Sequence, residues 1–309
     1  MLKQIMLLIV MTLLLVAQEI SPIPFEIVYD KQKAALGKQL FFDAGLSKDG
    51  TISCASCHTL PGNGANSTAY SYGVKGTEGI INSPTVLNAV YNFVQFWDGR
   101  TKDLNAQVRG PIENPTEMAS SMKEAVAYVK SQAHYVKTFN LLYKAGVDED
   151  TISDAIAEFE KALITPNSRF DQYLRGDTNA LSATEKEGYA LFQDDGCISC
   201  HNGRNIGGNM YQKIGIIIPY RHKGKGNLGR YRVTKLDEDK MVFKVPSLRN
   251  ISQTAPYLHD GTAKNLKEVI EDMYEHQLGR KPTKHTVKVL KAFLKTLDGE
   301  IPTILKDAS

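Results

Sequence analysis

Apolar residues recur three and four positions apart through most of the chain, which is the spacing of one buried helix face. The clearest segments of this kind are 33–43, 117–146, 151–166, 182–196, 263–279 and 286–297. Alternating apolar and polar positions are scarce, and the one candidate strand is 213–218, KIGIII. The pattern therefore predicts a mainly α chain with long loops, above all at 202–240, which is rich in Gly and Lys.

Capping and helix-breaking residues indicate where several of these helices begin and end. Ser182 and Glu185 form a capping box before the helix that ends near Phe192. Gly146 and Pro166 stop two earlier helices, and 166–177 is the natural boundary between two domains. We expect an N-terminal domain at 18–165 and a C-terminal domain at 166–309, whose last residues pack back on the first domain.

The first 17 residues have the layout of a secretory signal peptide. Lys3 precedes an apolar run from Ile5 to Val16, and Ala17 is followed by polar residues. An uncleaved anchor is the alternative, but the run is shorter than the ~20 residues that span a bilayer. No later segment is apolar enough to cross a membrane. We expect cleavage near Ala17 and a soluble mature protein, without a membrane span, in a periplasm.

Length and charge narrow the function classes further. A chain of 309 residues with 42% hydrophobic residues can bury a large core and fits one large domain or two of ordinary size. The net charge of +3 comes from nearly balanced acids and bases spread along the chain. Because no basic patch or stripe stands out, nucleic acid is excluded as a partner.

All four cysteines lie in two copies of the pattern Cys-x-x-Cys-His, whose first cysteines are 143 residues apart. This is the attachment signature of c-type haem, in which both thiols bond to the porphyrin and the His ligates the iron. The alternatives are a redox dithiol, which needs no adjacent His, and a zinc site, which needs further Cys or His ligands. The chain is therefore predicted to bind two covalent haem c groups, one on Cys54, Cys57 and His58, the other on Cys197, Cys200 and His201.

Spacing alone does not assign the other face of either iron. Met273 can ligate the second iron through its sulfur, or it can simply complete the apolar face of its helix. Near the first haem, Glu117 can transfer protons between the oxygens of a peroxide, or it can occupy the first turn of a helix that begins near Pro115. Trp97, the only tryptophan, can belong to a route for electrons or can be a buried aromatic residue.

Several motifs occur in order between Leu36 and Lys281: LGKQLFFDAGLSKDGTISCASCH, NSPTVLNAVYNFVQFWDGR, CISCHNG, KVPSLRN and APYLHDGTAKNLKEVIEDMYEHQLG. Together they resemble the bacterial di-haem cytochrome c peroxidases, a family that includes the MauG-like enzymes. The resemblance implies two cytochrome-c-like domains with one haem each and a calcium ion between them. It also makes a homodimer the expected assembly.

The resemblance also implies roles for individual residues. The N-terminal haem would be the low-potential site of peroxide reduction, with Glu117 and Gln107 in its distal pocket. The C-terminal haem would be the high-potential site that receives electrons, with Met273 as its second iron ligand. Trp97 matches the residue that lies between the haems. Asn82, Thr254 and Pro256 match the residues that contact calcium, the last two through backbone carbonyls, in keeping with the preference of this cation for oxygen.

The chain departs from the family pattern in the loop after the first haem motif. Many members carry there a distal His that closes the resting iron, and the corresponding residue here is Val74. Val has no ligand atom, so we expect the first haem to stay open. Tyr70 and Tyr72 are near enough in sequence to be alternative ligands, since a phenolate can bind haem iron.

The leading hypothesis for function is a peroxidase that reduces hydrogen peroxide to water. Its expected electron donor is a small periplasmic protein, either a c-type cytochrome or a cupredoxin. The first alternative is a MauG-like oxidase that builds a cofactor in a partner protein, but members of that type resemble this family with Tyr at the position of Met273. The second is a non-catalytic electron carrier, which would need both irons closed.

Overall fold

The computed structural model describes residues 19–221 and 227–306, so the expected signal peptide at 1–17 lies outside the described residues. The helices are α1 (Lys31–Phe42), α2 (Cys54–Cys57), α3 (Leu104–Glu113), α4 (Met122–Ser131), α5 (Ala133–Leu142), α6 (Glu149–Lys161), α7 (Arg169–Leu174), α8 (Ala183–Asp194), α9 (Tyr231–Thr234), α10 (Leu266–Leu278), α11 (Lys284–Lys295) and α12 (Thr303–Lys306). Short 3-10 helices include η2 (Val74–Gly76), η3 (Ala89–Tyr91), η4 (Cys197–Ser199) and η6 (Ile251–Gln253). The mainly α fold class is confirmed.

A single two-stranded antiparallel sheet occurs within the described residues. It pairs β1 (Tyr211–Lys213) with β2 (Val242–Lys244), and Tyr211 lies opposite Lys244. The predicted strand at 213–218 is wrong beyond its first residue. Gly215 has a φ of 80°, outside the extended region, and Ile217 and Ile218 donate backbone hydrogen bonds to the carbonyl of His276 on α10 instead of to a neighbouring strand.

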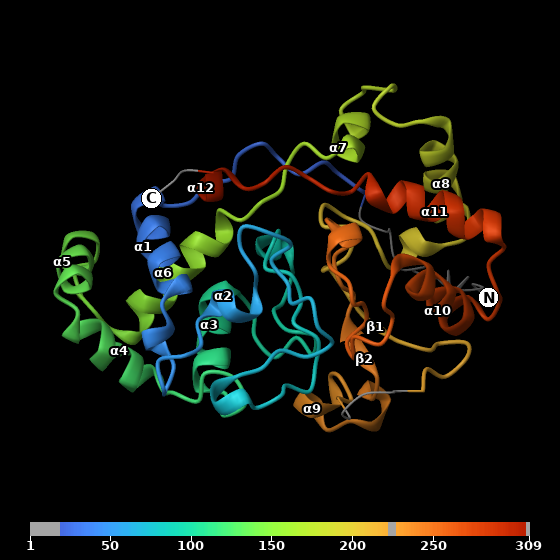
Figure 1. Ribbon diagram of the computed structural model, residues 1–309. Coiled ribbons are helices and arrows are strands. Elements are labelled where there is room, and N and C mark those ends of the chain that lie inside the picture. Colours follow the sequence, from blue (N-terminus) through green and yellow to red (C-terminus); the bar gives the residue numbers. More distant parts are fainter. Residues whose placement is uncertain (1–18, 222–226, 307–309) are drawn as a thin grey trace, which may run out of the picture.

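The apolar helix faces gather into two main hydrophobic cores, one in each half of the chain (Figure 1). The first is built around α1 and α6, where the rings of Phe41 and Phe159 meet edge to face at 5.2 Å. A β-carbon at Gly37 would lie 1.8 Å from the carbonyl oxygen of Ala155, so only glycine permits this close approach of the helices. α1 leads directly toward the first haem motif.

The second core contains a similar close helix contact that depends on glycine. It packs α8 against α11, and a β-carbon at Gly188 would lie 2.1 Å from the carbonyl oxygen of Val289. α8 leads to the second haem motif, and its N-terminus carries the predicted capping box of Ser182 and Glu185. In each half, a glycine-dependent helix pair therefore fixes the approach to one haem motif.

The two ends of the described chain each pack on the opposite half (Figure 1). Ile20 belongs to the second core, and the backbone N–H of Ile23 donates to Asp171. α12 packs on the first core, where Lys38 donates to the carbonyl of Ile304. Each end of the described chain therefore helps to join the two halves. The division of the chain into domains at residue 165 stays a prediction.

No helix in 19–221 or 227–306 combines the length and the apolar character that a membrane span requires.

Candidate haem and peroxide site

One cavity of about 1050 Å³ runs between the two halves and reaches both haem motifs. Its walls include all the Cys and His residues of the two motifs together with Trp97. Most of the remaining lining is apolar, supplied by both cores and by the loops that follow each motif. The geometry therefore places two attachment sites on one continuous, largely apolar space.

The first motif forms the short helix α2 and ends at His58. The Nδ1 atom of His58 lies 3.1 Å from the carbonyl oxygen of Gly64, so Nε2 remains for a metal. Burial lowers the pKa of His58 below its ordinary value. A neutral ring held by a backbone carbonyl is the form in which His ligates a metal.

The second motif forms η4 and ends at His201. Burial lowers the pKa of His201 to about 4, so this ring is also neutral. Its buried Nδ1 atom has no hydrogen-bond partner in the part of the chain that the structure describes. The backbone carbonyls of Ile206 and Pro246 lie close to this ring, so Nε2 is the nitrogen left for a metal, as at His58.

The thiols of Cys54 and Cys197 do not resemble those of a redox dithiol. Burial raises the pKa of Cys54 and raises that of Cys197 to about 11, whereas reactive dithiols have lowered values. Within the described residues, no group of three or more His, Cys, Asp or Glu side chains could hold a metal ion such as zinc. Covalent haem attachment is the chemistry that these thiols fit.

A buried cation completes the fit of the cavity to haem. The Lys244 side chain lines the cavity, and burial lowers the pKa of its ammonium to about 8. No acidic side chain of the described residues forms an ion pair with it. A haem carries two carboxylates, and a buried ammonium is stabilised by such a partner. The residues present therefore fit the group that the motifs imply.

The loops around the cavity are related by an internal two-fold repeat with an offset of 162 residues. The backbone N–H of Asn82 donates to the carbonyl of His259, and the N–H of Lys244 donates to the carbonyl of Trp97. The offset relates Asn82 to Lys244 and Trp97 to His259. The two hydrogen bonds are therefore equivalent, because each joins the first residue of one copy to the second residue of the other. The repeat thus brings Trp97 and His259 together at the middle of the cavity, with ring centroids 6.4 Å apart.

Trp97 is held in a fixed orientation there. Its indole N–H donates to the carbonyl of Asn82 at 2.8 Å, and its ring meets Phe243 edge to face at 6.2 Å. It is half-buried, lines the cavity that reaches both attachment sites, and belongs to neither main core.

Glu117 and Gln107 both line the cavity near the first motif. Glu117 does not occupy the first turn of a helix, because α4 begins at Met122 with Ser121 as its cap and Ala119 interrupts the chain with a φ of 49°. The amide of Asn114 donates to Glu117 Oε1 at 2.7 Å. Burial raises the pKa of Glu117, which adapts it to exchange protons nearer to neutral pH.

In the loop where the chain departs from the family pattern, the candidate ligand side chains stay out of the cavity lining, although Ser71 and Gly73 of the same loop belong to it. Val74 is 5% exposed, and its backbone N–H donates to the carbonyl of Glu117 at 2.8 Å. The phenol of Tyr72 is 54% exposed and donates to Glu78. Val74, Tyr70 and Tyr72 are all absent from the described residues that line the cavity. The loop is packed beside Glu117 without offering a ligand to the space in front of it.

The remaining candidate residues also line the cavity. Met273 projects from α10 into the same space as His201. Asn82, Thr254 and Pro256, the residues predicted to contact calcium, all border the cavity although Asn82 is far from the others in sequence. The side-chain amide of Asn82 donates to the carbonyls of Thr68 and Ala69, both at 3.3 Å.

Two residues that line the cavity, Lys244 and Glu160, were not predicted as site residues from the sequence. Lys244 begins KVPSLRN, and the signal that could have found it is the alignment of this motif with NSPTVLN, which starts at Asn82. Glu160 lies on α6, is 4% exposed, and its Oε2 atom has no partner among the described residues. Burial raises its pKa to about 8. The helical pattern of α6 gave no sign that this carboxyl is turned toward the cavity.

Comparison with known proteins agrees with this geometry. A family model described as di-haem cytochrome c peroxidase matches residues 31–179. The cytochrome c551 peroxidase of Nitrosomonas europaea is 48% identical over 288 residues, which cover 92% of this chain and 85% of that protein. The cytochrome c peroxidase Ccp of Escherichia coli is 43% identical over 293 residues, which cover 94% of this chain but 63% of that longer protein.

Among solved structures, the chain is similar to a MauG-like protein associated with microbial copper homeostasis. The TM-score is 0.78 at 27% identity, and the match covers 92% of this chain and 94% of that one. The sequence identity to the two peroxidases is therefore clearly higher than the identity to the MauG-like structure.

Proposed function

Because the chain belongs to the di-haem cytochrome c peroxidase family and is an enzyme of that kind, we propose that it reduces hydrogen peroxide at the haem on Cys54, Cys57 and His58. When bound, the haems supply one-electron chemistry and an iron that peroxide can reach. The observation that carries the proposal is the pairing of a half-buried carboxyl in the cavity lining, Glu117, with a residue, Val74, that lies outside the lining and has no ligand atom.

Glu117 is the residue placed to move protons. Asn114 fixes one carboxylate oxygen, Oε1, by its hydrogen bond, and the second oxygen can take a proton from one peroxide oxygen and return it to the other. Gln107 lines the same space and offers an amide to orient the substrate. Each peroxide takes up two protons and two electrons and leaves as two waters.

The electrons are proposed to enter at the second haem, with His201 and Met273 as its iron ligands. Trp97, held by its bond to the carbonyl of Asn82, lines the cavity that reaches both attachment sites, which supports a role in transfer toward the first. A small c-type cytochrome or cupredoxin in a periplasm is the proposed donor. A calcium ion at Asn82, Thr254 and Pro256 and a homodimer complete the proposal.

The alternatives are less well supported. A MauG-like oxidase is expected to carry Tyr where Met273 lines the cavity here. A passive carrier would need a sixth ligand at the first haem, and the described residues around Val74 supply none.

We expect the purified protein with both haems to oxidise a reduced small c-type cytochrome only when hydrogen peroxide is present, with two cytochromes consumed for each peroxide. Stopped-flow absorbance of the cytochrome measures this stoichiometry, and a reduced cupredoxin in a parallel assay identifies the preferred class of donor. Failure of every reduced donor to be oxidised, with both haems shown to be attached, would contradict the proposal.

A further inference from the structure

An aromatic chain continues from Trp97 into the C-terminal half. The ring of His259 lies 6.4 Å from that of Trp97 and stacks on Phe243 at 4.2 Å. On its other side, His259 meets Tyr220 at 5.9 Å, edge to face. Tyr220 is thus separated from Trp97 by a single ring, and every centroid distance along the way is that of an ordinary aromatic contact.

Tyr220 has the surroundings of a phenol that can lose an electron. It is 7% exposed, and its hydroxyl lies 3.0 Å from Asp260 Oδ2 and 2.9 Å from the Thr262 hydroxyl. Burial raises the pKa of Tyr220, and the negative charges of Asp260 and Asp272 raise it further. The phenol is therefore neutral, and loss of an electron requires that its proton leave at the same time. The Asp260 carboxylate is in place to accept that proton.

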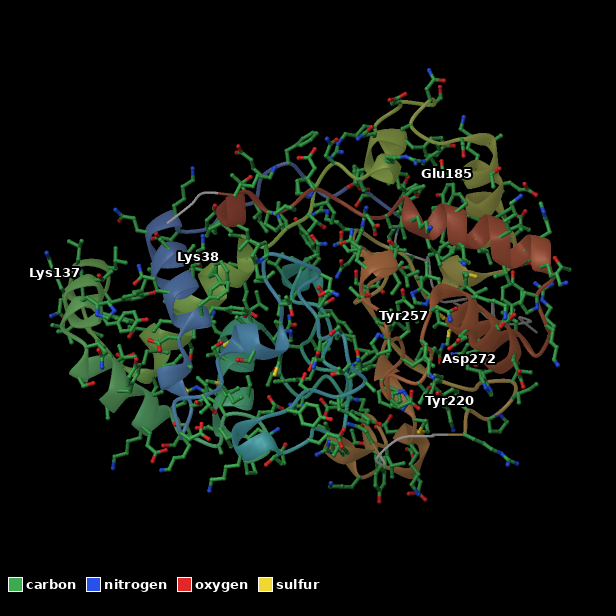
Figure 2. The ribbon with its side chains drawn as sticks, viewed as in Figure 1. Lys38, Lys137, Glu185, Tyr220, Tyr257 and Asp272 are labelled. Atoms are coloured by element: carbon green, nitrogen blue, oxygen red, sulfur yellow. The ribbon has the colours of Figure 1, made fainter. Side chains whose placement is uncertain are left out.

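The chain of rings ends near the surface. Tyr220 meets the imidazole of His276 edge to face at 5.0 Å, and His276 lies on α10, one turn after Met273. Figure 2 shows Tyr220 in the C-terminal half, close to Asp272 of the same helix. The residue that follows, Arg221, is exposed, so the chain of rings that begins at Trp97 comes close to solvent at Tyr220.

We propose that Tyr220 is a redox-active tyrosine that takes oxidising equivalents from Trp97 when the external donor is exhausted. Tyr220 gives one electron to a Trp97 from which one electron has been removed, so Trp97 returns to its neutral form. The proton of the Tyr220 hydroxyl moves to the Asp260 carboxylate, leaving a neutral tyrosyl radical. The oxidant is hydrogen peroxide, which takes up two electrons and two protons and leaves as two waters. Tyr220 would supply one of these electrons by way of Trp97, and the haem irons, when bound, would supply the other, so the inference rests on the proposed peroxidase function.

The test mixes oxidised holoenzyme with one equivalent of hydrogen peroxide without donor and freezes the sample for electron paramagnetic resonance. We expect a tyrosyl radical in the native protein, with a line shape that changes when the protein contains ring-deuterated tyrosine. Tyr220→Phe keeps the ring contacts and should lose the signal. Asp260→Asn removes the proton acceptor and should lower the yield of the radical.

A matched control is Tyr135→Phe. Tyr135 is also a buried phenol bonded to a carboxylate, Asp43 Oδ2 at 2.8 Å, but it belongs to the first core, where its ring meets His134 rather than the rings around Trp97. This variant should keep the radical.

The outcomes separate the two hypotheses because peroxide consumption is measured in the same samples. A radical that persists in Tyr220→Phe, that is lost equally in Tyr135→Phe, or that is absent from the native protein while peroxide is consumed would overturn the role of Tyr220. If peroxide is not consumed at all, the peroxidase function fails and the relay fails with it.

Discussion

Replacement of Glu117 by Gln should lower kcat/KM for hydrogen peroxide by about 10²- to 10⁴-fold, the usual contribution of a positioned proton-transfer group. The amide has the size of the carboxyl and can still accept from Asn114 through its oxygen, so the cavity should keep its shape. What the variant loses is the second carboxylate oxygen that exchanges the proton. Steady-state kinetics with a reduced small cytochrome measure the loss.

The pH profile distinguishes proton transfer from a structural role. Because burial raises the pKa of Glu117 above 4.5, the carboxylate form is lost at a higher pH than in an exposed Glu. The kcat/KM of the native enzyme should therefore fall as the pH drops through this raised pKa, and the fall should be absent in Glu117→Gln. Glu124→Gln changes an exposed carboxyl in the first turn of α4, outside the cavity lining, and is the control, with kinetics close to native. Equal losses in both variants would remove Glu117 from the mechanism.

Replacement of Arg249 by Ala should lower the free energy of unfolding of the holoenzyme by about 3–5 kcal/mol, because it leaves a buried carboxylate without its partner. Arg249 is 1% exposed and donates to Asp171 at 2.7 Å. Its other donors reach the carbonyls of Arg204 and Ser21, so one guanidinium joins the second core to the N-terminal segment. Chemical denaturation followed by haem absorbance and by circular dichroism measures the change.

Arg169→Ala is the matched control for this prediction. Its guanidinium is 51% exposed and pairs with Glu185 at the start of α8, seen at the outer edge of the C-terminal half in Figure 2. Exposed ion pairs contribute about 0–1 kcal/mol, so this variant should unfold nearly as the native protein does. A loss of stability in Arg249→Ala no greater than that in Arg169→Ala would show that the buried pair does not hold the N-terminal segment on the second core.

The features that the sequence predicted well are those whose signals are local. The haem motifs, the capping box at Ser182 and the helix that carries Met273 each follow from a few neighbouring residues. The position of Glu117 did not, because the turn that follows Asn114 and the positive φ of Ala119 delay α4 until Met122. The apolar run at 213–218 was mistaken for a strand because its alternative, hydrogen bonding to the end of α10, depends on residues about 60 positions away.

The internal repeat was not predicted from the sequence, for a different reason. Its two copies share backbone hydrogen bonds, but the matching residues that make these bonds at the cavity differ: Asn82 corresponds to Lys244 and Trp97 to His259. Hydrophobic periodicity reports which residues are buried, but not which backbone groups pair across a cavity. The joining of Asn82 with Thr254 and Pro256 on one wall is likewise a product of tertiary structure, and only the family resemblance anticipated it.

The central claim is that the first haem is open in the resting enzyme, because position 74 carries Val, which is buried outside the cavity lining and has no ligand atom. Rapid mixing of the fully oxidised enzyme with hydrogen peroxide, without any reductant, tests this claim most directly. We predict an immediate change of the haem spectrum and a high-spin ferric signal from one haem before mixing. An oxidised enzyme with two low-spin haems that ignores peroxide until it receives one electron would contradict the account.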